Sequence, residues 1–208
     1  MAPTGPELRA ILFDVGETLV DETRWWSEHA RRIGVSPIVL AATLGMAIER
    51  EEDHRAVWGY LGHRVPTGND EVGYVASDLY PDAGLCLAEL RADGYYVGVA
   101  GNQGADLEHD LRSFGLDADL VTSSVGLGAR KPAPEFFERL VASTGFSAAE
   151  CAYVGDRVDF DVRPAKAAGL VAIHVRRGPW GRLQRGSEEA DVQIDSLAEL
   201  PAALRSLS

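Results

Sequence analysis

Short hydrophobic runs alternate with amphipathic stretches along most of the chain. Apolar runs predict strands at residues 10–13, 95–100, 120–122, 151–154, 170–175 and 192–194. Apolar positions spaced three and four residues apart predict helices at residues 81–92, 105–114, 134–144, 161–168 and 197–204. Strands that alternate with helices are typical of βαβ units. The pattern therefore predicts an α/β fold with a Rossmann-like, mostly parallel sheet and helices on both faces.

The stretch between residues 20 and 80 departs from this alternation. Helical spacing extends from about residue 21 to residue 52, whereas Gly, Pro and Asn interrupt residues 59–73. We expect a small α-helical cap, residues 20–80, inserted after the first strand of a core domain formed by residues 1–19 and 81–208. Aromatic side chains of the insertion could line its inner face, although packing is the simpler expectation for each: Trp25, Trp26, Trp58 and Tyr60.

The composition is that of an ordinary globular protein, with 46% hydrophobic and 25% charged residues among 208. A formal charge of −12 argues against a nucleic-acid partner and against a polybasic membrane surface. The only cysteines, Cys86 and Cys151, are too few for a disulfide framework. Neither a signal peptide nor a membrane helix is indicated, so we expect a cytoplasmic protein. The sequence does not indicate an oligomeric state.

Polar side chains follow several of the predicted strands. Asp14, Asn102 and Asp156 stand at strand ends, and Lys131 lies on the loop after the strand at 120–122. In an open parallel sheet, ligands bind beyond the carboxyl ends of the strands. We therefore expect these side chains to converge on one edge of the sheet.

Four segments resemble the ordered motifs of the haloacid dehalogenase-like (HAD) hydrolase superfamily: ILFDVGETL, VGVAGNQ, GARKPAPEFF and YVGDRVDFDVRPAKAAGL. Their order, their spacing and the helical insertion after the first motif also match, so the resemblance covers nearly the whole chain. The chain is similar to the helical-cap phosphatases of that superfamily. The resemblance implies a Mg²⁺-dependent hydrolase that acts on a small-molecule phosphate, either an ester or an acyl phosphate.

The resemblance also implies roles for individual residues. Asp14 takes the position of the nucleophile, which forms an aspartyl-phosphate. Lys131 takes the position of the cation that neutralises the nucleophile and the phosphoryl oxygens. The implied Mg²⁺ ligands are oxygens of Asp14, Gly16, Asp156 and Asp161. The implied phosphate-binding residues are Thr18, Gly101, Asn102 and Lys131.

Some of these positions keep alternative interpretations. Asp161 could act as a helix N-cap, alone or together with metal binding. Asp159, in the same loop, is expected to be a solvated bystander. The turn at residues 102–104 is expected to open a helix at Ala105 whose backbone N–H groups can receive an oxyanion.

Two positions depart from the family pattern. Gly16 stands where active phosphatases usually carry a general-acid Asp, and Gly101 stands where a Ser or Thr hydroxyl normally binds phosphate. Three explanations for Gly16 stay open: a substrate with a good leaving group, a proton from another residue, or slow or absent catalysis. Glu17 is adjacent, but on an extended segment its side chain would point away from the site.

Two other functions compete with the phosphatase. A catalytically weak HAD-fold protein could use the same cleft to bind a metabolite or a partner, and Gly16 and Gly101 favour that alternative. A 2-haloacid dehalogenase needs no metal and no acid for its leaving halide. The acidic pair of Asp156 and Asp161 argues against it, because acids around a departing halide would be repulsive without a cation.

Overall fold

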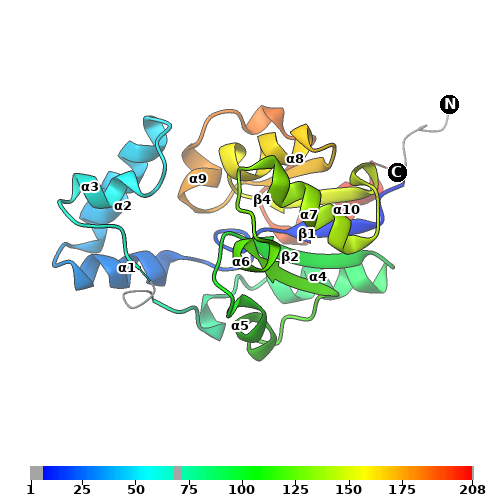
Figure 1. Ribbon diagram of the computed structural model, residues 1–208, viewed down its shortest axis with the longest axis horizontal. Coiled ribbons are helices and arrows are strands. Elements are labelled where there is room, and N and C mark those ends of the chain that lie inside the picture. Colours follow the sequence, from blue (N-terminus) through cyan, green and yellow to red (C-terminus); the bar gives the residue numbers. More distant parts are fainter. Residues whose placement is uncertain (1–6, 68–71, 208) are drawn as a thin grey trace.

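The computed structural model describes residues 7–67 and 72–207 (Figure 1). Six strands form one parallel sheet in the order β3-β2-β1-β4-β5-β6. The strands are β1 (Ala10–Phe13), β2 (Tyr96–Gly101), β3 (Leu120–Ser123), β4 (Cys151–Gly155), β5 (Val171–Val175) and β6 (Val192–Ile194). All the strands predicted from the sequence are confirmed, with ends that differ by no more than one residue.

The strand order has a reversal at the centre of the sheet. The chain runs outward from β1 to β2 and β3, then returns to β4 on the other side of β1 and continues outward to β6. Phe13, the last residue of β1, is paired with Val99 on one side and Val154 on the other. Such a reversal leaves a crevice at the carboxyl ends of the two central strands, where ligands bind in folds of this kind.

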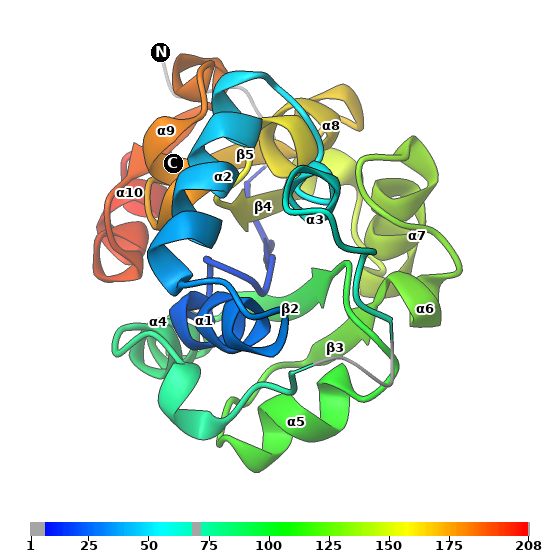
Figure 2. The ribbon, with the colours of Figure 1, turned by 90° about the vertical axis from the view of Figure 1, so that its left-hand side faces the viewer.

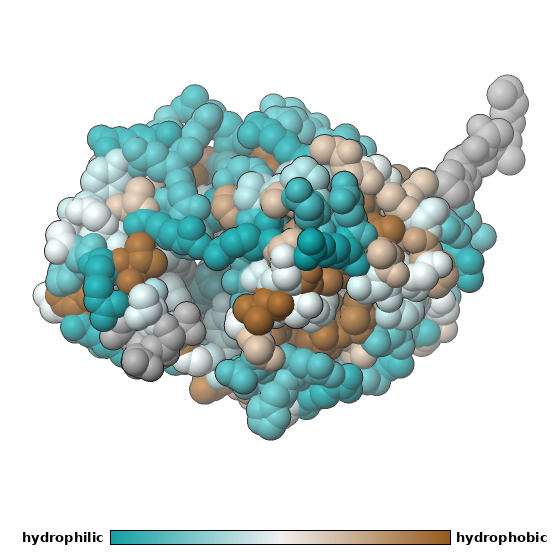
Figure 3. Space-filling view, in the orientation of Figure 1, coloured by the Kyte–Doolittle hydropathy of each residue, from teal (hydrophilic) through white to brown (hydrophobic). Residues whose placement is uncertain are grey.

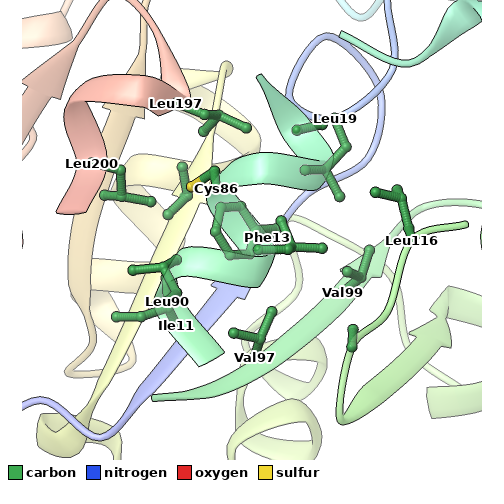
Figure 4. Packing of buried hydrophobic residues seen from close by; sticks show 14 of the residues in the cluster. Ile11, Phe13, Leu19, Cys86, Leu90, Val97, Val99, Leu116, Leu197 and Leu200 are labelled. Atoms are coloured by element: carbon green, nitrogen blue, oxygen red, sulfur yellow. The ribbon is translucent and has the colours of Figure 1, made fainter. Parts of the chain in front are cut away.

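Helices cover both faces of the sheet, as predicted. Ile11 and Phe13 point to one face, which is packed against α4 (Ala83–Ala92), α5 (Leu107–Ser113) and α10 (Leu200–Arg205) (Figure 4). Alternate residues of a strand point to opposite faces, so Leu12 contributes to the second cluster. That face is packed against α7 (Pro134–Thr144) and α8 (Arg163–Ala167).

Helix boundaries agree less closely with the prediction than strand boundaries do. The helix at 134–144 is confirmed, whereas those at 81–92 and 105–114 each begin two residues late. The helix predicted at 161–168 is a π-helical turn, η4 (Val158–Val162), followed by α8, whose first turn contains Pro164. Proline suits a first turn because its missing N–H would have no partner there. Short elements complete the fold: α6 (Ser124–Leu127), α9 (Gly178–Leu183), and the 3-10 turns η2 (Ala76–Asp78), η3 (Ala148–Glu150), η5 (Ser187–Glu189) and η6 (Leu197–Glu199).

A helical cap is inserted between β1 and α4. It consists of α1 (Thr23–Arg32), α2 (Pro37–Glu49) and α3 (Ala56–Tyr60), which lie in front of the sheet in Figure 2. The cap has its own hydrophobic cluster, which Trp180 of α9 joins from the core. The exact limits at residues 20 and 80 stay a prediction.

The cysteines and the surface agree with the composition of an ordinary globular protein. Cys86 and Cys151 are unpaired and buried, and they lie in the clusters on opposite faces of the sheet. The face drawn in Figure 3 is mostly hydrophilic. Among the described residues, no single helix is long and apolar enough to cross a membrane. Helices α1 and α2 together have the length and composition of a membrane span, by those two criteria only, and the pair is bent by 113°.

Candidate active site

Asp14 extends β1 by one residue at the central crevice. Its backbone N–H donates to the carbonyl of Val154, 2.9 Å away, so the ladder to β4 continues past the end of the strand. The chain then turns sharply, because the N–H groups of Leu19 and Val20 both donate to the carbonyl of Val15. This turn leaves Asp14 buried at the carboxyl end of the sheet.

Lys131 lies between two carboxylates. Its Nζ is 2.7 Å from Asp14 Oδ1 and 2.5 Å from Asp161 Oδ1, and all three side chains are buried. Burial alone would lower the pKa of Lys131, but the carboxylates of Asp14 and Asp161 raise it well above its usual value. The lysine is therefore a fixed positive charge directly beside the predicted nucleophile.

Asn102 holds the backbone of Lys131 with both ends of its amide. Its Oδ1 accepts from the Lys131 N–H at 2.9 Å, and its Nδ2 donates to the Lys131 carbonyl at 3.0 Å. The amide side chain is thus bonded to the loop that carries the lysine. Phosphate binding by Asn102 stays a prediction.

Three carboxylates converge at this edge of the sheet. Asp14, Asp156 and Asp161 each offer an oxygen, and these oxygens lie within 4.8 Å of one another. His174 Nε2 is 2.8 Å from the Asp156 carbonyl, and the Arg157 N–H donates to Asp161 Oδ2 at 2.9 Å. Burial, then the carboxylates of Asp161 and Asp14, raises the pKa of Asp156 well above its usual value. Hard oxygen ligands in such a buried group suit a divalent cation such as Mg²⁺.

The alternative role of Asp161 as a helix N-cap does not match the structure. The residue lies inside η4, and its carboxylate binds Lys131 and the backbone of Arg157. Asp159 was expected to be a solvated bystander. Its carboxylate pairs with the guanidinium of Arg157, with an Nη2–Oδ2 distance of 2.6 Å. Although burial raises the pKa of Asp159, Arg157 holds it below its ordinary value.

A cavity of about 370 Å³ lies between the cap and the carboxyl ends of the strands. The predicted site residues that line it are Asp14, Gly16, Asn102, Lys131 and Asp156. Asp161 lies behind them, almost fully buried, and Thr18 is fully buried and does not line the cavity. Of the cap aromatics, Trp25 and Trp26 line it, whereas Trp58 and Tyr60 do not.

The helix after Asn102 does not begin where the sequence suggested. The α5 helix begins at Leu107 rather than Ala105, and its N-cap residue is Asp106. Asp106 and Asp110 both line the cavity. Acidic side chains therefore surround the helix terminus that was expected to receive an oxyanion.

The space beside Gly16 is filled from another part of the chain. A Cβ atom at position 16 would lie 2.5 Å from Glu22 Oε1 and 2.9 Å from Glu22 Cδ. The hydroxyl of Tyr74 donates to the same oxygen at 2.6 Å, and Glu22 and Tyr74 both line the cavity. Burial raises the pKa of Glu22 from its ordinary value, more than its hydrogen bond with Tyr74 lowers it. No motif drew attention to Glu22, which is six residues beyond Gly16 in the sequence.

The space beside Gly101 is filled in the same way. A Cβ atom there would lie 2.3 Å from Gln103 Oε1 and 2.5 Å from Asp14 Oδ1. The Gln103 side chain lines the cavity, and its Oε1 is buried without a hydrogen-bond partner in the described part of the chain. The Gln103 amide therefore fills the space that a side chain at position 101 would enter.

Glu17 does not point away from the site. The segment is a turn rather than extended, Glu17 has a φ of +51°, and its side chain lines the cavity. The Tyr80 hydroxyl donates to its Oε2 at 2.5 Å. Burial, with a smaller contribution from the Glu22 carboxylate, raises the pKa of Glu17 to about 8. The carboxyl is thus held in place by Tyr80.

Arg157 connects the core to the cap. Its Nη1 is 3.2 Å from His54 Nδ1, and its guanidinium lies 4.4 Å from the centre of the Trp180 ring and 3.9 Å from that of Phe160. Arginine only donates, so Nδ1 of His54 accepts and the imidazole is neutral. Burial lowers the pKa of His54 to about 4; the Asp53 carboxylate raises this pKa, and the Arg157 guanidinium lowers it further. Trp180, to which the sequence assigned no role, therefore belongs to the wall of the cavity.

Comparison with known proteins identifies the family. The family model for haloacid dehalogenase-like hydrolases matches residues 8–169, which include the first three motifs and all but the last residue of the fourth. The chain belongs to this family. The glyceraldehyde 3-phosphate phosphatase of Methanocaldococcus jannaschii is 29% identical to this HAD-like hydrolase, over 96% of this chain and 98% of that protein. The expectation of a HAD-family enzyme is confirmed.

Solved structures share the architecture of this HAD-like hydrolase. A HAD phosphatase from Thermococcus onnurineus has a TM-score of 0.64 at 23% identity, over 95% of this chain and 98% of that one. An L-2-haloacid dehalogenase from Xanthobacter autotrophicus has a TM-score of 0.69 at 20% identity, over 97% of this chain and 100% of that one. Both chemistries therefore occur on this fold, and the site residues must distinguish them.

Proposed function

We propose that this HAD-like hydrolase is a Mg²⁺-dependent phosphatase that works through an aspartyl-phosphate at Asp14. One observation carries the proposal: the buried Asp14 carboxylate faces the cavity, 2.7 Å from the Lys131 ammonium and beside two further carboxylates. A phosphatase needs a fixed nucleophile, a fixed cation and a place for a metal in one location. The cluster supplies these three parts.

The reaction follows from the positions of these groups. A carboxylate oxygen of Asp14 attacks phosphorus, the bond from phosphorus to the leaving oxygen breaks, and water then hydrolyses the aspartyl-phosphate. Lys131, 2.7 Å from Asp14, offsets charge on the phosphoryl oxygens. Asn102 acts through Lys131, since both ends of its amide hold the lysine backbone.

Asp14, Asp156, Asp161 and the carbonyl of Gly16 would hold the Mg²⁺. The fit rests on the three buried carboxylates that converge within 4.8 Å, of which Lys131 reaches Asp14 and Asp161 only. When bound, the ion supplies positive charge that reduces the repulsion between an anionic phosphate and Asp14. Of the three carboxylates, Asp156 is the one without an ion pair to Lys131, so the charge of the ion would stabilise it most.

The substrate class is a small phosphorylated molecule, as an ester or an acyl phosphate. A cavity of about 370 Å³ limits its size, and the cap covers the open side of the strands. We infer that residues 20–80 close over the substrate, with Trp25, Trp26 and His54 on the cap side of the cavity. Two relatives that match almost the whole chain are glyceraldehyde 3-phosphate phosphatases.

The test is a panel of 4-nitrophenyl phosphate, acetyl phosphate and glycerol phosphate with Mg²⁺. We expect turnover of at least one class, lost in Asp14→Asn, which removes the nucleophile and keeps the size of the side chain. Asp93→Asn is the matched control, because Asp93 ends α4 and does not line the cavity. Turnover equal to that of Asp14→Asn on every class would instead favour a protein that only binds metabolites or partners.

Metal dependence has its own experiment. Titration calorimetry with Mg²⁺ should detect binding by the native protein and much weaker binding by Asp156→Asn. Chelation of the metal should remove the phosphatase activity. Chloride release from 2-chloropropionate, unaffected by the chelator and lost in Asp14→Asn, would favour a dehalogenase.

A further inference from the structure

The carboxyl group of Glu22 occupies the volume that a side chain at position 16 would enter. The separation of 2.5 Å between Glu22 Oε1 and a Cβ atom at position 16 is far below a van der Waals contact. Glu22 is the N-cap residue of α1, where the cap begins, six residues beyond Gly16 in the sequence. The cap therefore delivers a carboxyl group to the place left open by the glycine.

Glu22 is held in this place from a second direction. Tyr74, on the segment that returns from the cap to the core, donates its hydroxyl to Oε1 at 2.6 Å. The hydroxyl of Tyr74 binds this oxygen of Glu22 and not the other one, Oε2. Glu22, Tyr74, Asp14 and Gly16 all line the same cavity.

We propose that Glu22 is the general acid and base of the reaction, in place of the side chain that Gly16 lacks. The inference rests on the proposed phosphatase function and deepens it. As Asp14 attacks phosphorus and the bond to the leaving oxygen breaks, the proton on the Glu22 carboxyl passes to that oxygen and the alcohol leaves. Water then attacks the aspartyl-phosphate and gives its proton to Glu22, while the bond from phosphorus to Asp14 breaks and phosphate is released.

Glu17 is the nearest competitor for this role. Its Oε2 accepts a hydrogen bond from the Tyr80 hydroxyl at 2.5 Å. A Cβ atom at Gly178 would lie 2.6 Å from Glu17 Cδ, so the carboxyl is packed against the first residue of α9. Glu17 does not occupy the volume that Gly16 leaves open.

The first experiment measures dependence on the leaving group, because an acid matters most when the leaving oxygen is basic. Glu22→Gln should lower kcat/KM for glycerol phosphate by about 10²- to 10⁴-fold and for 4-nitrophenyl phosphate by far less. The ratio kcat/KM covers the step in which the leaving group departs. Glu28→Gln, on the same helix and paired with Arg24 outside the cavity, is the matched control.

The second experiment moves the acid. Glu22→Ala opens the space beside Gly16, so the double variant Gly16→Asp with Glu22→Ala should recover activity on glycerol phosphate relative to Glu22→Ala alone. Gly16→Asp alone places two carboxyl groups in one volume and should not raise that activity. Recovery by the double variant would show that the reaction uses one carboxyl group in this place.

The outcomes separate this inference from the proposed function. If the native protein is no more active than Asp14→Asn, the proposed function fails. If the native protein is active and Glu22→Gln loses activity equally on both substrates, or loses none, Glu22 is not the acid. A selective loss on glycerol phosphate in Glu17→Gln but not in Glu22→Gln would assign the role to Glu17 and overturn the inference.

Discussion

The amide of Asn102 forms two hydrogen bonds with the backbone of Lys131, one to its N–H and one to its carbonyl, at 2.9 and 3.0 Å. Asn102 directly follows β2, and Lys131 lies beyond β3 and α6, so these bonds fix a loop that is distant in sequence. The same loop carries the lysine whose ammonium lies between Asp14 and Asp161. Asn102 is therefore a positioning residue for the cation of the site.

Removing the Asn102 amide should impair catalysis more than folding. Asn102→Ala should lower kcat for 4-nitrophenyl phosphate by about 10- to 100-fold, the usual effect of losing a residue that orients a catalytic group. Ser143→Ala, which removes an exposed hydroxyl on α7, is the control for loss of a polar group. Unchanged kcat in Asn102→Ala would show that the loop holds Lys131 without the amide.

Removing the ammonium of Lys131 should destabilise the metal-free protein. Lys131→Met leaves the carboxylates of Asp14 and Asp161 buried without their cation, which should cost about 3–5 kcal/mol of unfolding free energy. Added Mg²⁺ should restore part of the loss, because it supplies charge to the same carboxylates. Denaturant unfolding with and without Mg²⁺ measures both effects.

Lys166→Met provides the comparison for Lys131→Met. Lys166 pairs with Asp191 at 2.7 Å on the surface, so its loss should cost no more than about 1 kcal/mol, with no dependence on Mg²⁺. Equal responses of the two variants to Mg²⁺ would contradict the placement of the metal beside Lys131.

Restoring a hydroxyl at position 101 should reduce activity rather than improve it. In Gly101→Ser the new Cβ would meet Gln103 Oε1 and displace Asp14 Oδ1, 2.5 Å away. A misplaced nucleophile should cost about 10- to 100-fold in kcat/KM. Gly59→Ser, on α3 and outside the cavity, is the control, because nothing lies within 4 Å of a Cβ atom there. Adding Gln103→Ala to Gly101→Ser should recover part of the activity.

Acid should weaken the contact between the cap and Arg157. The pKa of His54 is about 4 in the folded protein and 6.5 ordinarily, so the unfolded chain binds a proton between these values that the folded chain does not. Its contribution to stability is complete above pH 6.5 and is lost as the pH falls toward 4. The groups that act on it are Asp53, which favours the proton, and Arg55, Arg130 and Arg157, which oppose it.

His54→Asn keeps a neutral hydrogen-bond acceptor and removes this titration. Between pH 7.5 and 5, the native protein should lose more unfolding free energy than the variant, by no more than about 1–2 kcal/mol because His54 is partly solvated. Parallel pH profiles would show that His54 does not titrate against Arg157.

The sequence by itself determined the sheet and the ends of its strands. Short apolar runs bounded by Gly, Asp and Asn leave few alternatives, and every predicted strand is present. Asp14 and Asp156 then follow central strands, and parallel strands end at one edge, so their convergence required only the order of the strands. Asp14, Lys131 and Asp156 lie together as this reasoning predicts, and Asp161, which only the family resemblance indicated, lies with them.

Only the tertiary structure decided what fills the spaces beside the two motif glycines. Glu22 and Gln103 take these places because the first turn of the cap and the loop after β2 bring their side chains there. The same is true of Trp180 on the cavity wall and of Asn102 on the Lys131 backbone. Periodicity and motif spacing describe neighbours along the chain, whereas these contacts depend on how separate elements pack. A glycine in a motif therefore reveals a missing side chain, but the residue that takes its place is selected by the fold.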